Sequence, residues 1–392
     1  MKEKTLLFLF LLTVITTGCS LNKQSKKELS YIDATKNYPT KELILTDIAD
    51  VTYVHLNSDN IDYLYSGYGV RRITKNTIVV YDNSSGAILF FFKDGKPKSR
   101  FNRQGRGPGE YMDVSMINYD EKTDDVFVGV FFPNAEFIQV YSSTGEHKRT
   151  ITMPGVSMSL IINFDEHSLF VYDANYGSAK LYIKQGGRAI IPGERCDSPF
   201  FLISKTDGAI IDNPKLPEKD IILMDPKGVR FGPLNVIKCP EGVLLCNPDA
   251  DTVFLYSKDK SLTPVLYKTP AASSADPMVI LNNCIDVGRY QFMELITVAW
   301  ENRAYPIKYY LRDKKTGEIF RQKLVLPEYR GKEFFIGPFR SQINYENGAI
   351  FELDLLELKQ AYRENRLSGK LKELVATLKE DDNNIFMLVQ FK

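Results

Sequence analysis

From about Val51 onward, short runs of β-branched and aromatic residues alternate with turn residues, and few stretches before residue 354 repeat at helical spacing. Five pairs of runs are joined by short turns rich in Gly, Asp, Ser and Lys, which favours β-hairpins. The predicted hairpins span residues 87–101, 137–151, 181–191, 252–267 and 307–325. A further strand-like run precedes each hairpin, at 77–81, 126–130, 169–172, 243–246 and 290–300. The pattern predicts an all-β body made of repeated meanders.

The spacing of these meanders indicates a β-propeller. Successive turns fall about 40 to 70 residues apart, near the spacing of propeller blades with variable loops. A sixth unit can be assembled from 349–353, 385–391 and the N-terminal run 51–57. Joining the two chain ends in one blade removes a free sheet edge. We therefore predict a six-bladed β-propeller over residues 41–392.

One strongly helical stretch interrupts the last predicted blade. Leu and Val residues recur at helical spacing between Leu355 and Leu378, and Ser368-Gly369 divides the run into two helices. We predict a helical insertion over about 354–380, packed on the flank or rim of the propeller. A helix that binds a partner is the alternative.

The N-terminus has the features of an export signal. Lys2 and Lys4 precede an apolar run over 6–15, and Thr16-Thr17-Gly18-Cys19 forms a small-residue cleavage context. Ten helical residues cover about 15 Å, half of the roughly 30 Å hydrocarbon core. The Gly-Cys junction resembles a bacterial lipobox, which predicts a signal peptide over 1–18, lipidation of Cys19 and attachment to a membrane. A general secretory signal with an incidental cysteine is the alternative. The polar, Lys-rich sequence that follows predicts a flexible tether over 19–40.

Composition narrows the range of functions. The 392 residues include 50 basic and 49 acidic side chains, so no bulk positive field favours nucleic acid as a partner. Three histidines, five cysteines and no CxxC pair make a zinc site or a histidine base improbable. Four cysteines follow Cys19 and allow three disulfide pairings: Cys196, Cys239, Cys246 and Cys284. Cys239 and Cys246 either pair across the turn 240–242 or remain buried thiols.

The segment Arg103-Gln104-Gly105-Arg106-Gly107-Pro108-Gly109-Glu110-Tyr111 is the most distinctive motif. Its alternating glycines are not followed by a helix or by Gly-Lys-Ser/Thr, which disfavours a phosphate loop. A tight loop between blades is the favoured interpretation, with a structural role for Gly105, Gly107, Pro108, Gly109 and Glu110. The alternative is an anion site on the rim, where the motif's arginines converge on a carboxylate or sulfate. Its ligand-binding candidates are Arg100, Arg103, Arg106 and Tyr111.

The stretch from Gly105 to Tyr111, preceded by the turn Lys93-Asp94-Gly95-Lys96, resembles the hallmark of the six-bladed β-propeller lipoproteins of Bacteroidetes, relatives of the NHL-repeat propellers. The resemblance extends to 42–51, 251–256 and 381–385 and covers essentially the whole mature chain. It implies a propeller fold and a place in the cell envelope, at the outer membrane on an undetermined face. That family has no established general activity, so the resemblance implies no catalytic residue.

The leading functional hypothesis is a propeller that binds or scaffolds at the envelope and recognises a glycan, a peptide or a partner protein, with no cofactor. Aromatic loop residues that could stack on sugars are Tyr65, Tyr68, Tyr176, Tyr305 and Trp300. A related hypothesis is assembly with an outer-membrane transporter or regulator, oriented by the lipid and the helical insertion.

The alternative is a metal-dependent hydrolase or lyase with its site in the propeller channel. Carboxylates near predicted strand ends could supply oxygen ligands: Asp82, Asp120, Asp165, Asp173, Asp249 and Asp251. Asp at strand ends more often makes turns, so no metal site and no catalytic residue is predicted. His55, His147 and His167 are separate in the sequence and are interpreted as structural.

Overall fold

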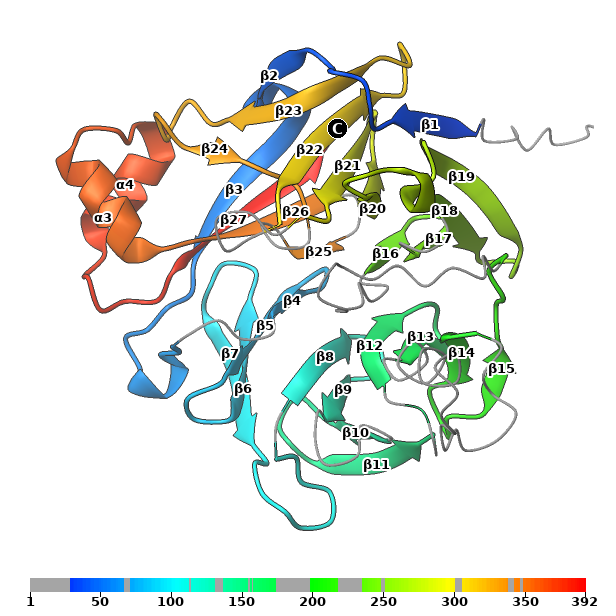
Figure 1. The fold of residues 1–392 in the computed structure, drawn as a ribbon. Coiled ribbons are helices and arrows are strands. Elements are labelled where there is room, and N and C mark those ends of the chain that lie inside the picture. The colour runs from blue at the N-terminus through cyan, green and yellow to red at the C-terminus, as the bar shows by residue number, and fades with distance from the viewer. Residues whose placement is uncertain are drawn as a thin grey trace, which may run out of the picture.

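In this computed structural model the described residues are 29–66, 71–112, 114–130, 137–153, 156, 158–173, 198–217, 235–247, 251–299, 305–337, 342–345 and 348–392. Within these ranges the strands form six sheets arranged around a common centre (Figure 1). The chain is an all-β propeller.

The sheets follow one another along the chain, and each begins with its innermost strand. The first contains β4 (Arg71–Ile73), β5 (Thr77–Asp82), β6 (Ala87–Phe92) and β7 (Pro97–Asn102). The second contains β8 (Val114–Asp120), β9 (Asp125–Val130), β10 (Phe137–Tyr141) and β11 (His147–Thr152). The third contains β12 (Met158–Asn163), β13 (Ser168–Asp173), β14 (Phe200–Ser204) and β15 (Ile210–Asp212).

The fourth sheet contains β16 (Asn235–Cys239), β17 (Gly242–Asn247), β18 (Thr252–Ser257) and β19 (Leu262–Thr269). The fifth contains β20 (Val279–Val287), β21 (Tyr290–Thr297), β22 (Ile307–Asp313), β23 (Ile319–Val325) and the short β24 (Glu333–Phe334). The last contains β25 (Gln342–Tyr345), β26 (Gly348–Leu353), β27 (Ile385–Phe391) and β3 (Ala49–His55). Short helical turns lie at α1 (Leu45–Ile48), η1 (Ile61–Tyr63) and η3 (Ala272–Ser274).

The position of a strand within its sheet explains its sequence pattern. Every residue of β5, β9 and β13 is buried, because these strands lie inside their sheets with neighbouring sheets on both faces. Such strands consist of nearly continuous apolar runs. In the outer strands β7 and β11 a single residue is buried, Phe101 and Ile151 respectively, and the others are exposed or half-buried. The apolar runs that predicted the meanders are therefore the buried inner strands of the sheets.

The ends of the chain close the ring. Strand β3 from the N-terminus pairs antiparallel with β27 from the C-terminus, in a register that matches Ala49 with Phe391 and His55 with Ile385. Strand β27 also pairs with β26. The predicted joining of the two termini in one sheet is confirmed, with β27 inside the sheet and β3 as its outer strand.

The predicted tether is wrong for the part that the structure describes. Strand β1 (Ser30–Asp33) pairs in parallel with β19, and β2 (Thr40–Ile44) pairs in parallel with β23. Ile32 has no exposed surface and anchors β1 in the core. Each strand covers the outer edge of a sheet, where backbone groups would otherwise stay unpaired. The sequence analysis missed these two strands because edge strands need few apolar residues, so a polar composition is compatible with them. Residues 19–28, including Cys19, lie outside the described residues.

The third sheet contains a hairpin that the sequence analysis did not predict. Strand β13 pairs with β14, which continues into β15 across the turn at Lys205–Gly208. The third predicted hairpin, at 181–191, lies outside the described residues.

The helical segments lie between β26 and β27. Helix α3 (Leu355–Arg363) begins where Asp354 accepts a hydrogen bond from the Glu357 backbone at 2.9 Å, and α4 (Gly369–Thr377) follows the predicted break. Leu358 and Val375 are completely buried and belong to the same core cluster as the adjoining strands. Figure 1 shows the two helices at the periphery of the ring. Among the described residues no helix has the length and apolar content needed to cross a membrane.

The register of β16 and β17 excludes a disulfide between Cys239 and Cys246. Cys239 lies opposite Gly242, and Cys246 lies opposite Asn235, so the two cysteines are four positions apart along the ladder. Four strand residues span about 13 Å, well beyond the roughly 7 Å between Cα atoms that a disulfide tolerates. Cys196 and the side chain of Cys284 lie outside the described residues.

Candidate functional site

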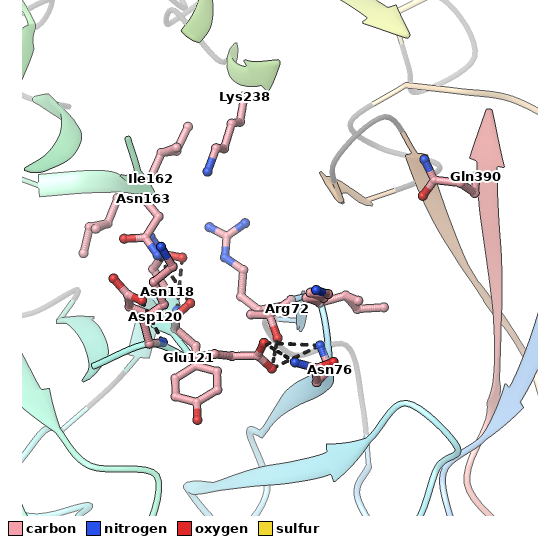
Figure 2. A pocket seen from close by; sticks show the side chains of 15 residues that line it. Arg72, Asn76, Asn118, Asp120, Glu121, Ile162, Asn163, Lys238 and Gln390 are labelled. Atoms are coloured by element: carbon pink, nitrogen blue, oxygen red, sulfur yellow. Dashed lines mark hydrogen bonds between the residues drawn. The ribbon is translucent and has the colours of Figure 1, made fainter. Parts of the chain in front are cut away.

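A cavity of about 710 Å³ lies among the innermost strands β4, β8, β12 and β16 (Figure 2). Ligand pockets in proteins commonly have about 300 to 1,000 Å³. Its wall combines aliphatic, amide and charged side chains: Arg72, Ile73, Thr74, Lys75, Asn76, Asn118, Tyr119, Asp120, Glu121, Lys122, Ile161, Ile162, Asn163, Lys238 and Gln390. The cavity is therefore large enough and polar enough to hold a small hydrophilic molecule.

Arg72 lies at the middle of this cavity. Its side chain is 9% exposed, and its Nε donates to the Ile117 carbonyl at 2.5 Å. No acidic side chain of the described ranges forms an ion pair with its guanidinium. Burial lowers the pKa of Arg72 to about 10, so the group remains charged at neutral pH. A buried cation with free N–H groups is a natural partner for an anion.

A second cation approaches from the opposite side. Lys238 projects from β16, is exposed to solvent, and directs its ammonium toward the Arg72 guanidinium in Figure 2. Two positively charged side chains directed into one space raise the electrostatic potential there and attract anions. The arrangement favours an anion between Arg72 and Lys238.

Two asparagine side chains form the adjoining wall, side by side in Figure 2. Asn118 Oδ1 accepts from the Tyr119 backbone at 3.0 Å, and Asn163 Nδ2 donates to the Tyr119 carbonyl at 3.4 Å. The other amide atoms, Asn118 Nδ2 and Asn163 Oδ1, are buried without a hydrogen-bond partner. Unsatisfied buried polar atoms are rare and call for an explanation.

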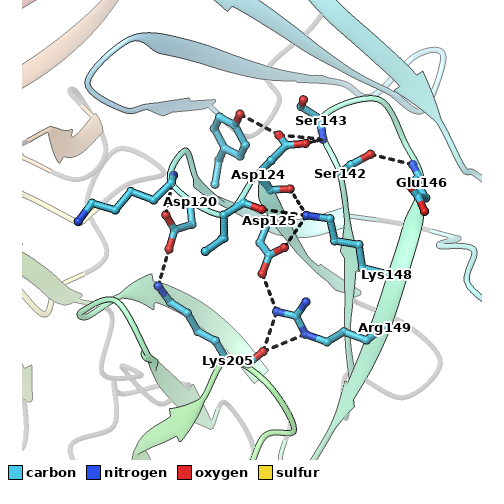
Figure 3. Close-up of polar contacts among 12 residues, drawn as sticks. Asp120, Asp124, Asp125, Ser142, Ser143, Glu146, Lys148, Arg149 and Lys205 are labelled. Carbon is cyan, nitrogen blue, oxygen red and sulfur yellow. Dashed lines mark hydrogen bonds and ion pairs between the residues drawn. The ribbon is translucent and has the colours of Figure 1, made fainter.

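The carboxylates of the cavity wall already have partners. Lys205 is 5% exposed, and its ammonium lies 2.6 Å from Asp120 Oδ2 (Figure 3). Glu121 accepts from the Thr74 hydroxyl at 2.6 Å and from the Asn76 backbone at 3.2 Å. Burial raises the pKa of Glu121, but hydrogen bonds, above all that from Thr74, outweigh it and hold the pKa below its usual value. Asp120 is thus paired with a cation and Glu121 is held by neutral hydrogen-bond donors, and neither forms an ion pair with Arg72.

The Arg103–Tyr111 motif forms the connection from β7 to β8. Tyr111 has no exposed surface, and its hydroxyl donates to the Gly86 carbonyl at 2.8 Å. The Arg103 backbone N–H donates to the same hydroxyl at 3.2 Å, and the Gly105 N–H donates to the Tyr111 carbonyl at 3.0 Å. Tyr111 is therefore a core residue and not the ligand contact proposed from the sequence.

The glycines of this loop are required by close contacts. A Cβ on Gly105 would lie 2.0 Å from Glu110 Oε2, and Glu110 Oε2 accepts from the Gly107 N–H at 2.7 Å. Gly109 has a φ of +72°, and its carbonyl accepts from the Tyr141 hydroxyl at 2.9 Å. The exposed Pro108 lies between them at the tip. The contacts of this segment support the interpretation as a structural loop.

The three arginines proposed for an anion site bind separate partners. Arg100 forms an ion pair of 2.5 Å with Asp62, and Arg103 Nε donates to the Gly145 carbonyl at 2.8 Å. Arg106 is exposed on the loop. The structure therefore does not gather them around one point, and the candidate anion site lies instead at Arg72, which the sequence analysis did not single out.

Comparison with known proteins places the chain in a family. The sequence profile described as "Domain of unknown function (DUF4934)" matches residues 29–390. The chain belongs to this family. The match extends over the whole described propeller of this DUF4934 protein. A search of curated proteins found no relative.

Solved structures similar to the DUF4934 chain share its fold at low sequence identity. A protein of Bacteroides fragilis NCTC 9343, described as exported, is 16% identical with a TM-score of 0.64, covering 93% of this chain and 100% of that chain. A member of the DUF4221 family from Bacteroides vulgatus ATCC 8482 is 10% identical with a TM-score of 0.48, covering 88% and 97%. The first of these supports the fold.

The aspartates considered as metal ligands make turns or ion pairs in this DUF4934 chain. Asp82 accepts from Ser84, Ser85 and the Ser66 backbone. Asp165 accepts from the His167 and Ser168 backbones at 2.8 Å, and Asp251 accepts from the Ala272 backbone and pairs with Lys268 at 2.9 Å. Within the described ranges no three His, Cys, Asp or Glu residues gather as a metal site. Asp249 lies outside those ranges, and Asp173 is a buried strand residue.

The histidines and aromatic candidates lie away from Arg72. His147 Nε2 is 2.8 Å from Gln139 Oε1, and burial lowers the pKa of His55. His167 is exposed in a turn. Tyr65 is 8% exposed and belongs to a core cluster, while Tyr305 packs against another cluster. Tyr68, Tyr176 and Trp300 lie outside the described residues.

Proposed function

We propose that this DUF4934 protein is an exported, lipid-anchored binding module that holds a small polar ligand in its central cavity. The observation that carries the proposal is the cavity itself, about 710 Å³ in volume, with the buried Arg72 guanidinium directed into it. In a propeller each sheet contributes one edge to a common centre, so a central site can contact a ligand from several sides.

We also infer that the six sheets correspond to six blades of one ring and that α3 and α4 are an insertion in the last blade. The innermost strands of neighbouring sheets contact one another. Strand β4 contacts β25 and β8, and β8 also contacts β12. Strand β16 contacts both β20 and β25. The insertion is supported by the pairing of β26 with β27 on either side of the two helices.

The proposed location rests on the N-terminal sequence. A basic start, a short apolar run and the Gly18-Cys19 junction are typical of a lipoprotein signal. The similar Bacteroides fragilis protein is described as exported, which agrees with this location. A bound lipid and a binding cavity together fit a receptor or scaffold held at the outer membrane, with a glycan, a peptide or an envelope protein as its partner.

The test is a binding screen with a variant that fills the cavity. The full chain in detergent is applied to an array of neutral and acidic glycans and short peptides. Lys238→Trp places a bulky side chain at the cavity, and Lys96→Trp, at a hairpin tip where Lys96 is 77% exposed, is the matched control. We expect at least one ligand that the wild type and Lys96→Trp bind and Lys238→Trp does not. Ligands unaffected by Lys238→Trp, or no bound ligand at all, would contradict the proposal.

A further inference from the structure

We propose that the central cavity contains an oxyanion subsite, formed by Arg72 and Lys238, that binds the carboxylate of a polyhydroxylated acid such as a uronic acid. This inference rests on the proposed function, because it names the class of ligand that the cavity takes. In this subsite the negative charge of the ligand is bound from opposite sides of the cavity, by Arg72 on β4 and by Lys238 on β16.

The case for an anion begins with Arg72. Its Nε is fixed by the Ile117 carbonyl at 2.5 Å, which leaves the outer guanidinium nitrogens to face the cavity. A guanidinium presents two parallel N–H donors that match the two oxygens of a carboxylate. The described carboxylates in the wall are occupied, Asp120 by Lys205 and Glu121 by Thr74 and Asn76. Neither carboxylate forms an ion pair with Arg72, so the outer N–H groups of its guanidinium are available to an anion from another molecule.

Lys238 supplies the second positive charge. It is an exposed side chain whose ammonium points toward Arg72 in Figure 2. A carboxylate between the two groups would accept paired hydrogen bonds from Arg72 and a charged hydrogen bond from Lys238. Because Lys238 lies at the surface of the cavity, it can close on the ligand without rearranging the core.

The adjoining wall explains why the ligand should carry hydroxyl groups. Asn118 has an unused donor, Nδ2, and Asn163 has an unused acceptor, Oδ1, beside Arg72 in Figure 2. The terminal torsion of asparagine is broad, so a modest rotation presents either group to the cavity. A hydroxyl both donates and accepts, and can satisfy either amide. Ile162, 6% exposed, also lines the cavity and offers an apolar contact to the C–H face of a sugar ring.

The test compares acidic sugars with their neutral parents, which differ at a single carbon. D-glucuronate and D-galacturonate are titrated calorimetrically into the full chain in detergent, beside D-glucose and D-galactose. We expect at least one uronate to bind at least tenfold more tightly than its parent, and inorganic sulfate to compete with it. Arg72→Met should reduce uronate affinity at least tenfold and leave the weak binding of the neutral sugar unchanged.

Two further variants keep the result interpretable. Lys238→Met alters an exposed side chain, so it should fold normally and still reduce uronate affinity. Lys96→Met removes an exposed cation that does not line the cavity, 77% exposed and paired with Asp94, and should leave the affinity unchanged. Circular dichroism and the melting temperature without ligand verify that Arg72→Met is folded.

The possible outcomes separate the two proposals. Equal affinity for uronates and neutral sugars, or a uronate preference that survives both Arg72→Met and Lys238→Met, would overturn the oxyanion subsite. If the array still shows ligands that Lys238→Trp abolishes, the binding function stands and the carboxylate inference alone fails. If no array ligand depends on the cavity, the proposed function itself is wrong.

Discussion

The side-chain amide of Asn383 donates a hydrogen bond to the Leu56 carbonyl at 3.0 Å, and so ties the segment before the last strand to the segment after β3. The same nitrogen donates to the Tyr63 carbonyl at 2.9 Å, and Asn383 Oδ1 accepts from the Tyr65 backbone at 3.1 Å. Asn383 is 2% exposed. One buried side chain thus satisfies three backbone groups where the ends of the chain meet.

We expect Asn383→Ala to lower the free energy of unfolding by about 3 kcal/mol, because three buried backbone groups lose their partner. Urea denaturation followed by fluorescence measures the change. Asn57→Ala is the control, since its side chain bonds only the exposed Asp59 and should cost less than about 1 kcal/mol. Equal effects of the two substitutions would show that Asn383 has no special part in closure.

The motif loop gives a second prediction. Tyr111→Phe removes the hydroxyl that donates to Gly86 and accepts from Arg103, while the ring stays in the core. We expect a loss of about 1 to 2 kcal/mol, because the Gly86 carbonyl and the Arg103 N–H lose their shared partner. Denaturant titration measures it, and glycan binding should not change. Loss of ligand affinity in a folded Tyr111→Phe protein would instead favour the rim site.

The buried ion pair between Lys205 and Asp120 connects the turn after β14 to the end of β8 (Figure 3). Lys205→Met leaves Asp120 buried without its counterion, and we expect a loss of about 3 to 5 kcal/mol. Asp120→Leu combined with Lys205→Met should recover much of that loss, because neither charge is then buried. A double-mutant cycle in urea measures the coupling. Additive effects of the two changes would show that the charges do not interact.

The free energy of unfolding should depend on pH through the ionisation of Asp125. Burial raises its pKa, but hydrogen bonds from Arg149 at 2.6 Å and Lys148 at 2.8 Å outweigh burial and lower the pKa below 3.8. A carboxyl with a lowered folded pKa stabilises the fold above its unfolded pKa and loses that contribution as the pH falls through the folded value. Wild-type stability should therefore decrease below about pH 4.

Asp125→Asn isolates this contribution. The variant should be less stable than the wild type at pH 7, and the difference should shrink as the pH approaches 2. Urea unfolding at pH 7, 5, 4 and 3 measures it. Asp381→Asn, at an exposed position, should follow the wild-type curve. A difference between wild type and Asp125→Asn that stays constant with pH would refute the assignment.

The proposed anchor predicts incorporation of lipid at Cys19. Labelled palmitate should enter the wild-type protein and should be absent from Cys19→Ala, which should also leave the membrane fraction. Cys246→Ala, which changes a buried strand residue, serves as the control and should still be labelled. Labelling of Cys19→Ala at the wild-type level would contradict lipidation at this position.

The sequence predicted much of the fold because propeller meanders are local structures. Residues of β5 and β6 lie close together in the chain, so their apolar runs and the Asp94-Gly95 turn after them already specify a meander. Locality gave no signal for β1, whose parallel pairing with β19 joins residues more than 200 positions apart.

By itself, the sequence determined the all-β class, the closure of the ring by its two ends and the division of the helical segment. Each depends on hydrophobic period, turn chemistry or spacing within a short stretch. Only the tertiary structure placed Arg72, Asn118, Asn163 and Lys238 around one cavity, because each comes from a different sheet and no local pattern links them. Their meeting is a consequence of the circular arrangement, which brings the innermost strand of every sheet to the same axis.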